Sequence, residues 1–283
     1  MLQKYFSTRF PRPIRLQQSP GRRLSAPLVH SLFAHTFFEY DLKEAAATRA
    51  AAHSCINHVI YRPKDLVGAE AFARFADGNG GYEDTTAMIE LAKQNGSIIK
   101  LSDLVISRVC EFIKTGILDE KDLSYIQVNL SVNDWNDPEL FNRVMSTVKK
   151  YETGTSQIML ELTEDCMSEH METVVKNVEE FNRVGIKLAM DNFGAANTNV
   201  TQMLHMPLNM IKIDKDLIAK AHLSSHSMEI LSEEVKLFEK FGLEMVAEGV
   251  ENVNQIDMVK EMGCTFGQGN CYGMPVSQAD FGK

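Results

Sequence analysis

The sequence lacks several features that would assign it to a specialised class of protein. Its 283 residues include only five cysteines, and no CxxC pair or HExxH motif predicts a disulfide framework or a zinc site. No apolar run approaches the roughly 18 residues of a membrane span. Basic residues are also scarce, 29 against 38 acidic ones, which argues against a general nucleic-acid surface. We therefore expect reduced thiols, a cytoplasmic location, no membrane span and no duplex nucleic acid partner.

Acidic residues are missing altogether from the first 38 positions. This stretch instead carries six basic residues and four prolines, at Lys4, Arg9, Arg12, Arg15, Arg22, Arg23, Pro11, Pro13, Pro20 and Pro27. Its composition is similar to that of a transit peptide, but the prolines favour a poorly ordered basic arm. We therefore divide the chain into this arm, residues 1–38, and one domain, residues 39–283, which has the size of a single β/α barrel.

Apolar segments with β-branched residues alternate with helical patterns through this domain. Strands are predicted at 58–63 (HVIYRP), 67–75, 124–131 (SYIQVNLS), 157–164 (QIMLELTE), 186–193 (IKLAMDNF), 209–214 (NMIKID), 243–251 (LEMVAEGVE) and 264–269 (CTFGQG). Helices are predicted at 40–54, 84–95, 101–115, 137–151, 168–185, 225–241 and 252–262, with a short one between the fifth and sixth strands. This alternation is typical of the α/β class with a parallel sheet. The fold predicted is a TIM-like β/α barrel of eight strands.

Polar residues recur where the apolar segments end. They are Asn129, Glu161, Asp191, Lys212 and Glu248, with Glu70 in an earlier segment and Gln268 in a later one. The carboxyl ends of barrel strands converge on one mouth, so we expect these side chains to meet there. Several carboxylates at one place need cations or protons to offset their charge. Oxygen ligands favour Mg²⁺ or Mn²⁺, and two such ions can activate water against a phosphodiester.

The residues in these segments resemble the motifs of the EAL family. Glu70-Ala71-Phe72, followed by Arg74, is similar to the Glu-Ala-Leu signature. Further matches follow in order at Asn129-Leu-Ser, Glu161-Leu-Thr-Glu164, Asp191-Asn-Phe-Gly, Lys212-Ile-Asp214, Glu248-Gly-Val-Glu251 and Gly267-Gln268-Gly269. The resemblance covers about residues 40–283. It implies a cyclic di-GMP phosphodiesterase built on a β/α barrel (the EAL fold), acting in bacterial second-messenger signalling.

The resemblance also implies a role for each matching side chain. Four positions match ligands of Mg²⁺ or Mn²⁺: Glu70, Asn129, Glu161 and Asp191. Lys212 matches the residue that orients the attacking water, and Glu248 matches a general base or metal partner. Arg74 and Gln268 match substrate-side contacts, while Glu164 matches a residue that steadies a loop. The family further implies a homodimer and a cyclic di-GMP ligand, and a regulatory protein partner is also considered.

Two departures from the family pattern bear on activity. The second aspartate of Asp-Asp-Phe-Gly is Asn192, which can ligate a metal but brings no charge. The loop that follows, residues 194–199, reads Gly-Ala-Ala-Asn-Thr-Asn in place of Gly-Thr-Gly-Tyr-Ser-Ser. Ala196 in place of glycine removes easy access to positive φ. We therefore expect one metal site, with the second one weakened.

Three functional hypotheses follow from this pattern. The favoured one is a phosphodiesterase that converts cyclic di-GMP to linear pGpG with weakened activity, because the other motif positions are intact. The alternative is a degenerate EAL domain that senses cyclic di-GMP or regulates a protein by contact. An unrelated metal-dependent barrel, such as an enolase-type enzyme, is the third.

Plainer structural roles also compete at single positions. Glu70 can be half of a structural ion pair, and Lys212 can be a snorkelling lysine. Trp135 is expected to pack over the mouth or rim of the barrel.

Overall fold

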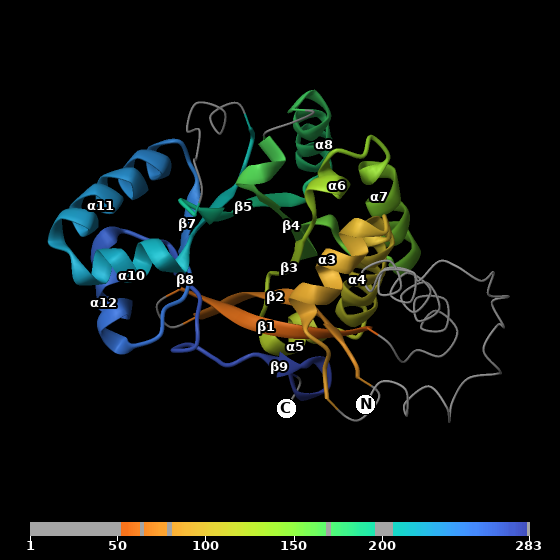
Figure 1. Ribbon diagram of the computed structural model, residues 1–283, viewed down its shortest axis with the longest axis horizontal. Helices are drawn as coiled ribbons and strands as arrows, with labels where there is room; N and C mark the ends of the chain where they lie inside the picture. Colours follow the sequence, from red (N-terminus) through yellow and green to blue (C-terminus); the bar gives the residue numbers. More distant parts are fainter. Residues whose placement is uncertain (1–51, 63–64, 78–80, 168–170, 196–205, 282–283) are drawn as a thin grey trace, which may run out of the picture.

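The computed structural model describes residues 52–62, 65–77, 81–167, 171–195 and 206–281. Nine strands form one sheet in the order β2-β3-β4-β5-β6-β7-β8-β1-β9, and an additional β1–β2 pairing closes it into a barrel. Helices surround the sheet, with α10, α11 and α12 on one side and α3, α4, α6, α7 and α8 on the other (Figure 1). Within these ranges no helix is long and apolar enough to cross a membrane. The predicted α/β class and TIM-like barrel are confirmed.

The strands and helices have the following bounds. The strands are β1 Ala52–Arg62, β2 Asp65–Phe75, β3 Tyr125–Asn129, β4 Ile158–Thr163, β5 Lys187–Phe193, β6 Met210–Ile213, β7 Glu244–Ala247, β8 Phe266–Gly267 and β9 Val276–Ser277. The helices are α3 Thr85–Gln94, α4 Ile98–Ile113, α5 Ile117–Lys121, α6 Val132–Trp135, α7 Leu140–Tyr151, α8 Met171–Val184, α10 Lys215–Leu223, α11 Ser225–Lys240, α12 Val253–Met262 and α13 Gln278–Phe281. Short 3-10 turns cover Thr155–Gln157 and Glu164–Met167.

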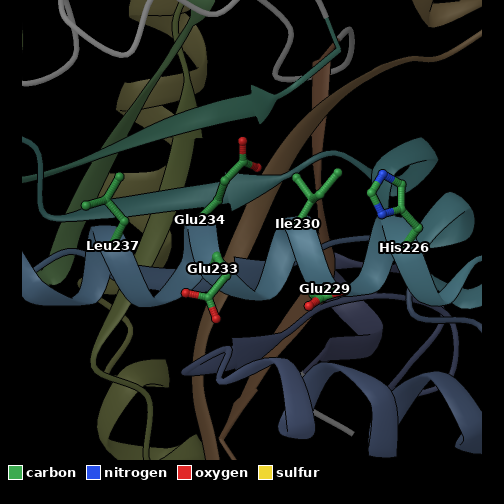
Figure 2. A pocket seen from close by; sticks show the side chains of 6 residues that line it. All are labelled: His226, Glu229, Ile230, Glu233, Glu234 and Leu237. Carbon is green, nitrogen blue, oxygen red and sulfur yellow. The ribbon is translucent and has the colours of Figure 1, made fainter.

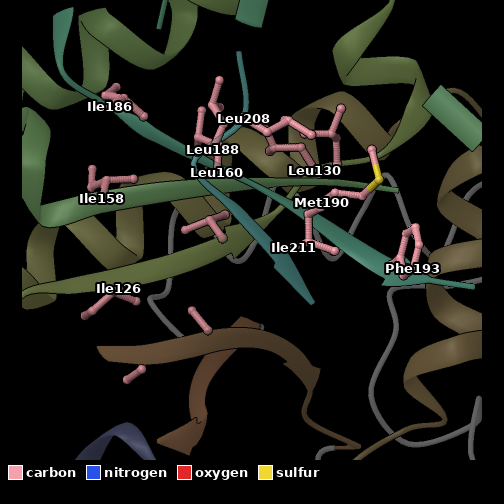
Figure 3. Close-up of a cluster of buried hydrophobic side chains, with 14 of the residues drawn as sticks. Ile126, Leu130, Ile158, Leu160, Ile186, Leu188, Met190, Phe193, Leu208 and Ile211 are labelled. Atoms are coloured by element: carbon pink, nitrogen blue, oxygen red, sulfur yellow. The ribbon is translucent and has the colours of Figure 1, made fainter. Parts of the chain in front are cut away.

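Alternation along the strands divides their side chains between two environments. Outward residues such as Ile126, Leu160 and Met190 pack under the helices in the main hydrophobic core (Figure 3). Inward residues form a second apolar cluster inside the barrel, made of Tyr125, Met159, Ala189, Met210, Val246 and Phe266. A strand buried on both faces is apolar at nearly every position, as these segments are. Polar residues are therefore concentrated where the strands end.

The first strand departs from the predicted topology. Strands β2 to β8 pair in parallel, but β1 runs antiparallel to β2, β8 and β9. The helix predicted over residues 40–54 is wrong at residues 52–54, which belong to β1, and residues 40–51 lie outside the described residues. Ala52 pairs with Phe75, so hydrogen bonding along β2 outweighs the helix propensity of the alanines.

Two helix predictions also need correction. The helix expected to start at Asp137 and Pro138 begins at Leu140 instead, because Asp137 Oδ1 accepts from the backbone N–H of Glu139 in a preceding turn. Helix α10 was not predicted. Its signal is the N-cap Asp214, whose Oδ1 accepts from the N–H of Asp216 at 2.8 Å.

Candidate active site

Seven polar side chains define the barrel mouth: Glu70, Asn129, Glu161, Asp191, Lys212, Glu248 and Gln268. Five of them come two positions after an inward apolar residue, as Glu161 follows Met159 and Lys212 follows Met210. Side chains two apart on a strand share a face, so the mouth residues lie one layer above the inward apolar cluster, which forms the floor of the mouth. Glu70 differs, because it lies in the middle of β2, as it does in the predicted strand 67–75.

Lys212 occupies the centre of the mouth. Its Nζ lies 2.9 Å from Glu248 Oε1 and 3.0 Å from both Glu70 Oε2 and Glu161 Oε1. Asp191 Oδ1 follows at 3.4 Å. Burial opposes the charged ammonium, but these carboxylates outweigh it and hold the pKa of Lys212 well above its usual value. The lysine is completely buried, so the snorkelling interpretation is wrong.

Glu70 is the most completely hydrogen-bonded carboxylate of the mouth. Asn129 Nδ2 donates to its Oε1 at 2.5 Å, and Gln268 Nε2 donates to its Oε2 at 2.6 Å. Lys212 Nζ donates to the same Oε2 at 3.0 Å. Burial alone would raise the pKa of Glu70, but the ammonium and the two amides outweigh burial and lower it. Glu70 therefore stays ionised, and the structural ion pair considered from the sequence is present.

Glu161 has the opposite environment. Among the described residues, no donor makes a hydrogen bond of good geometry to either of its carboxylate oxygens. Burial and the nearby charge of Glu70 raise its pKa well above the usual value, against the attraction of Lys212. This carboxylate is therefore short of positive charge.

Asp191 and Asn192 are joined side by side at the end of β5. Asn192 Nδ2 donates to Asp191 Oδ2 at 2.8 Å. The backbone of Asn192 is left-handed, with φ 58, and the β5–β6 register shifts between Met190 and Phe193. Asparagine tolerates this conformation better than most residues. Strand β5 thus has one residue more than β6 across this register shift. As a result the side chain of Phe193 faces the outer core, where it packs on Phe238.

Glu248 is a mouth carboxylate with a raised pKa. Its pKa is about 7, because burial and the charges of Asp191 and Glu70 raise it more than the ammonium of Lys212 lowers it. Its side chain is 17% exposed, so it borders on solvent. A carboxyl with this pKa can exchange a proton at neutral pH.

Two predicted residues lie outside this cluster. Arg74 lies four positions beyond Glu70 on β2, where its Nη1 donates to Ala73 O and its guanidinium is 5.8 Å from the Phe72 ring centroid. Glu164 Oε1 accepts from the backbone N–H of Gly194 at 2.8 Å, at the start of the loop after β5. Residues 196–199 of that loop lie outside the described residues.

Two further residues lie next to the mouth: Gln127, which was not assigned to the site from the sequence, and Trp135, which was expected over its mouth or rim. Gln127 is completely buried among the floor residues, and its Nε2 lies 3.0 Å from Met159 Sδ. Trp135, expected over the mouth or rim, is instead fully buried beside Phe181. Its indole Nε1 donates to the backbone carbonyl of Glu161 at 3.0 Å. The sequence signal for Gln127 is its place two residues before Asn129; Trp135 has no comparable signal.

The charge and donor balance of the mouth fit a hard divalent cation. Four carboxylates surround one ammonium, and the described oxygens without a hydrogen bond include Glu161 Oε2, Asp191 Oδ1 and Gln268 Oε1. Oxygen-rich, negatively charged sites are the kind that Mg²⁺ and Mn²⁺ prefer. Within the described ranges, no group of three acidic, histidine or cysteine side chains is already arranged to hold a metal. The carboxylates converge on the ammonium of Lys212.

A separate hollow lies on the outer face of α11. It has a volume of about 540 Å³ and is lined by His226, Glu229, Ile230, Glu233, Glu234 and Leu237 (Figure 2). None of these residues belongs to the mouth. The hollow is lined by a single helix, whereas seven strands contribute to the mouth, so the chemistry is assigned to the mouth.

Comparison with known proteins identifies the family. The EAL domain model matches residues 59–275, so the chain belongs to the EAL domain family. It is 26% identical over 245 residues to the oxygen sensor protein DosP of Escherichia coli, covering 83% of this chain and 31% of DosP. It is also 26% identical over 210 residues to the cyclic di-GMP phosphodiesterase NbdA of Pseudomonas aeruginosa, covering 74% of this chain and 27% of NbdA. The chain thus spans about a third or less of these relatives.

Solved structures support the same fold. The MucR phosphodiesterase in complex with cyclic di-GMP matches with a TM-score of 0.75 at 24% identity, over 85% of this chain and 97% of that one. The EAL enzyme Bd1971, bound to cAMP and cyclic di-GMP, matches with a TM-score of 0.80 at 19% identity, over 91% and 69%. The predicted membership of the EAL family is confirmed.

Proposed function

We propose that this chain is a metal-dependent phosphodiesterase that converts cyclic di-GMP to linear pGpG with weakened activity. The observation that carries the proposal is the convergence of four carboxylates on Lys212 at the barrel mouth. Curated relatives named as cyclic di-GMP phosphodiesterases support the substrate. Because the chain spans only part of those relatives, the substrate needs a direct test.

Each mouth residue has its own role in the proposed reaction. Glu70, Asn129, Glu161, Asp191 and Asn192 would hold Mg²⁺ or Mn²⁺. When bound, such an ion lowers the pKa of water and offsets the charge of the phosphodiester. The ammonium of Lys212 orients the attacking water, while Gln268 and Arg74 position the substrate. Glu164 holds the loop at Gly194.

Glu248 supplies the base for the reaction. With a pKa of about 7 it is partly ionised at neutral pH, so Oε2, the oxygen not paired with Lys212, can take a proton from water. A new P–O bond forms to the water oxygen, and the bond from phosphorus to the ribose 3′ oxygen breaks. The leaving 3′ oxygen takes a proton from solvent and becomes a hydroxyl, Glu248 returns its proton to solvent, and linear pGpG is the product.

The test is hydrolysis by the purified chain with Mn²⁺ or Mg²⁺. We expect pGpG from cyclic di-GMP and no product from cAMP, the second nucleotide bound by the structural neighbour Bd1971. Glu70→Gln should abolish turnover, whereas Glu233→Gln on the exposed face of α11 should not change it. Turnover that survives Glu70→Gln contradicts the mechanism.

The second candidate is a degenerate EAL domain that binds cyclic di-GMP or a regulatory protein without hydrolysis. It is favoured by the hydrogen bond of Asn192 to Asp191, which occupies Oδ2 and brings no charge. Calorimetry that detects cyclic di-GMP binding with no pGpG formed would favour this candidate. If the chain binds neither nucleotide nor metal, regulation by protein contact is the function that remains.

Assembly stays a prediction from the family resemblance, and location stays a prediction from the cysteine pattern. We propose a homodimer in the cytoplasm, and light scattering coupled to size exclusion measures the assembly. The basic arm, residues 1–38, lies outside the described residues.

A further inference from the structure

The only tryptophan of the chain hydrogen-bonds to the backbone of a mouth residue. Trp135 ends α6, and its Nε1 donates to the carbonyl oxygen of Glu161 at 3.0 Å. The backbone N–H of Leu130 donates to the same oxygen at 3.3 Å. The indole is completely buried and makes an edge contact with Phe181, with ring centroids 6.0 Å apart. Two donors, one at the end of α6 and one just before its start, therefore hold this carbonyl oxygen.

The hydrogen bond from Trp135 holds the backbone of Glu161, whose side chain receives fewer donors than that of Glu70. Glu70 is held through its carboxylate by Asn129, Gln268 and Lys212. Among the described residues Glu161 receives no amide donor, and Lys212 Nζ lies 3.0 Å from its Oε1. Because fewer donors hold this carboxylate, the position of its backbone decides how far its oxygens can reach.

Helix α6 is itself held by its own N-cap and by two neighbouring helices. Asp134 Oδ2 accepts from the N–H of Ser131 at 2.9 Å and from Ser102 Oγ on α4 at 2.7 Å. Asn177 Nδ2 on α8 donates to the carbonyl oxygen of Trp135 at 3.0 Å. These contacts make a four-residue helix a rigid support for the indole.

We infer that Trp135 is a positioning residue, whose indole N–H fixes Glu161 for the binding of a divalent cation. The inference rests on the proposed function. It assigns to Trp135 a role separate from packing, since its N–H donates to the backbone carbonyl of Glu161. Partners of this kind behind a metal ligand change affinity or activity by about 10–100-fold when removed.

The test replaces Trp135 by a residue that has an aromatic ring but no N–H. Trp135→Phe should raise the Mn²⁺ dissociation constant about tenfold, measured by calorimetry. In a Glu161→Gln background the same change should have no further effect on the dissociation constant. Phe181→Leu is the matched control, because it removes the ring contact and leaves the N–H. It should lower the urea midpoint with the Mn²⁺ affinity unchanged.

A second form of the test avoids any change of shape. Because the chain has one tryptophan, biosynthetic replacement by benzothienylalanine substitutes sulfur for the indole N–H at this site alone. It should reproduce the affinity loss of Trp135→Phe.

The outcomes separate this inference from the proposed function. If the effects of Trp135→Phe and Glu161→Gln on the Mn²⁺ dissociation constant simply add, the positioning role is overturned. A wild-type chain that binds Mn²⁺ but hydrolyses no cyclic di-GMP refutes the proposed function, and the double-mutant cycle in the dissociation constant still decides the role of Trp135. A wild-type chain that binds no Mn²⁺ overturns the positioning role.

Discussion

The mouth has two walls, one on β2 with Glu70 and one on β4 with Glu161, and they hold their carboxylates in contrasting ways. On the β2 side, Glu70 accepts from two amides and an ammonium, and its pKa is lowered. On the β4 side, Glu161 lies just as deep but receives no hydrogen bond of good geometry from the described residues, and its pKa is raised. Burial is the same for both, so the donors to Glu70 and the like charges near Glu161 make the difference.

This contrast shows which part of the site stabilises the fold and which part is left for a ligand. A satisfied carboxylate contributes to folding, whereas an unsatisfied one costs free energy that a bound ligand can recover. The signature glutamate of the family, Glu70, thus also braces the mouth through Lys212. Glu161 is the group with the most to gain from a cation.

The largest effect is expected from removing the shared ammonium. Lys212→Met leaves four carboxylates without their counter-charge, and breaking a buried pair costs about 3–5 kcal/mol. Urea unfolding should show this loss, and Mn²⁺ should restore part of it. The control Lys236→Met removes an exposed lysine paired with Glu233 and should change stability by less than about 0.5 kcal/mol. Equal stability of the two variants contradicts the central role of Lys212.

The pH dependence comes next and extends the contrast to Glu248. Its pKa is raised from 4.5 to about 7, so the folded state binds a proton more tightly than the unfolded state. The resulting stability is complete below pH 4.5 and is lost as pH rises through about 7, a change on the order of 2–3 kcal/mol. Urea midpoints of the metal-free protein should fall between about pH 5 and 8, and Glu248→Gln should flatten this slope. An unchanged slope in the variant refutes the assignment.

Two matched substitutions test the contrast between the walls. Glu70→Gln removes a carboxylate from two amides and an ammonium and should cost about 1–3 kcal/mol. Glu161→Gln removes a carboxylate whose charge is disfavoured by burial and by Glu70, and it should be neutral or slightly stabilising without metal. Urea unfolding measures both. Equal losses would mean that the hydrogen bonds do not distinguish the two walls.

The smallest effect is expected at Asn192. Asn192→Asp puts a second charge beside Asp191 and should raise Mn²⁺ affinity about tenfold, because carboxylate count sets affinity for hard cations. It should also lower metal-free stability slightly. Asn192→Ser, which is small and uncharged, is the control and should not raise affinity. Unaltered Mn²⁺ affinity and turnover in Asn192→Asp would show that this position does not limit the site.

Much of the fold was predictable because its signals are local. The apolar segments ending at Asn129, Glu161 and Asp191 are strands in the structure. The antiparallel direction of β1 was not predictable, since it depends on pairing with β2 and β8. Trp135 was misplaced because an aromatic residue after a strand does not reveal which backbone oxygen its N–H will find.

The sequence by itself determined the barrel class, the family and the residues that line the mouth, because alternation and motif order are properties of neighbouring positions. Tertiary structure alone decided how those residues share charge. Lys212 is 142 residues from Glu70, and Gln268 is 198 residues from it. Contacts over such distances follow from closure of the sheet, which places β2, β6 and β8 around one mouth. That closure is what gives Glu70 two amide donors and leaves Glu161 with none among the described residues.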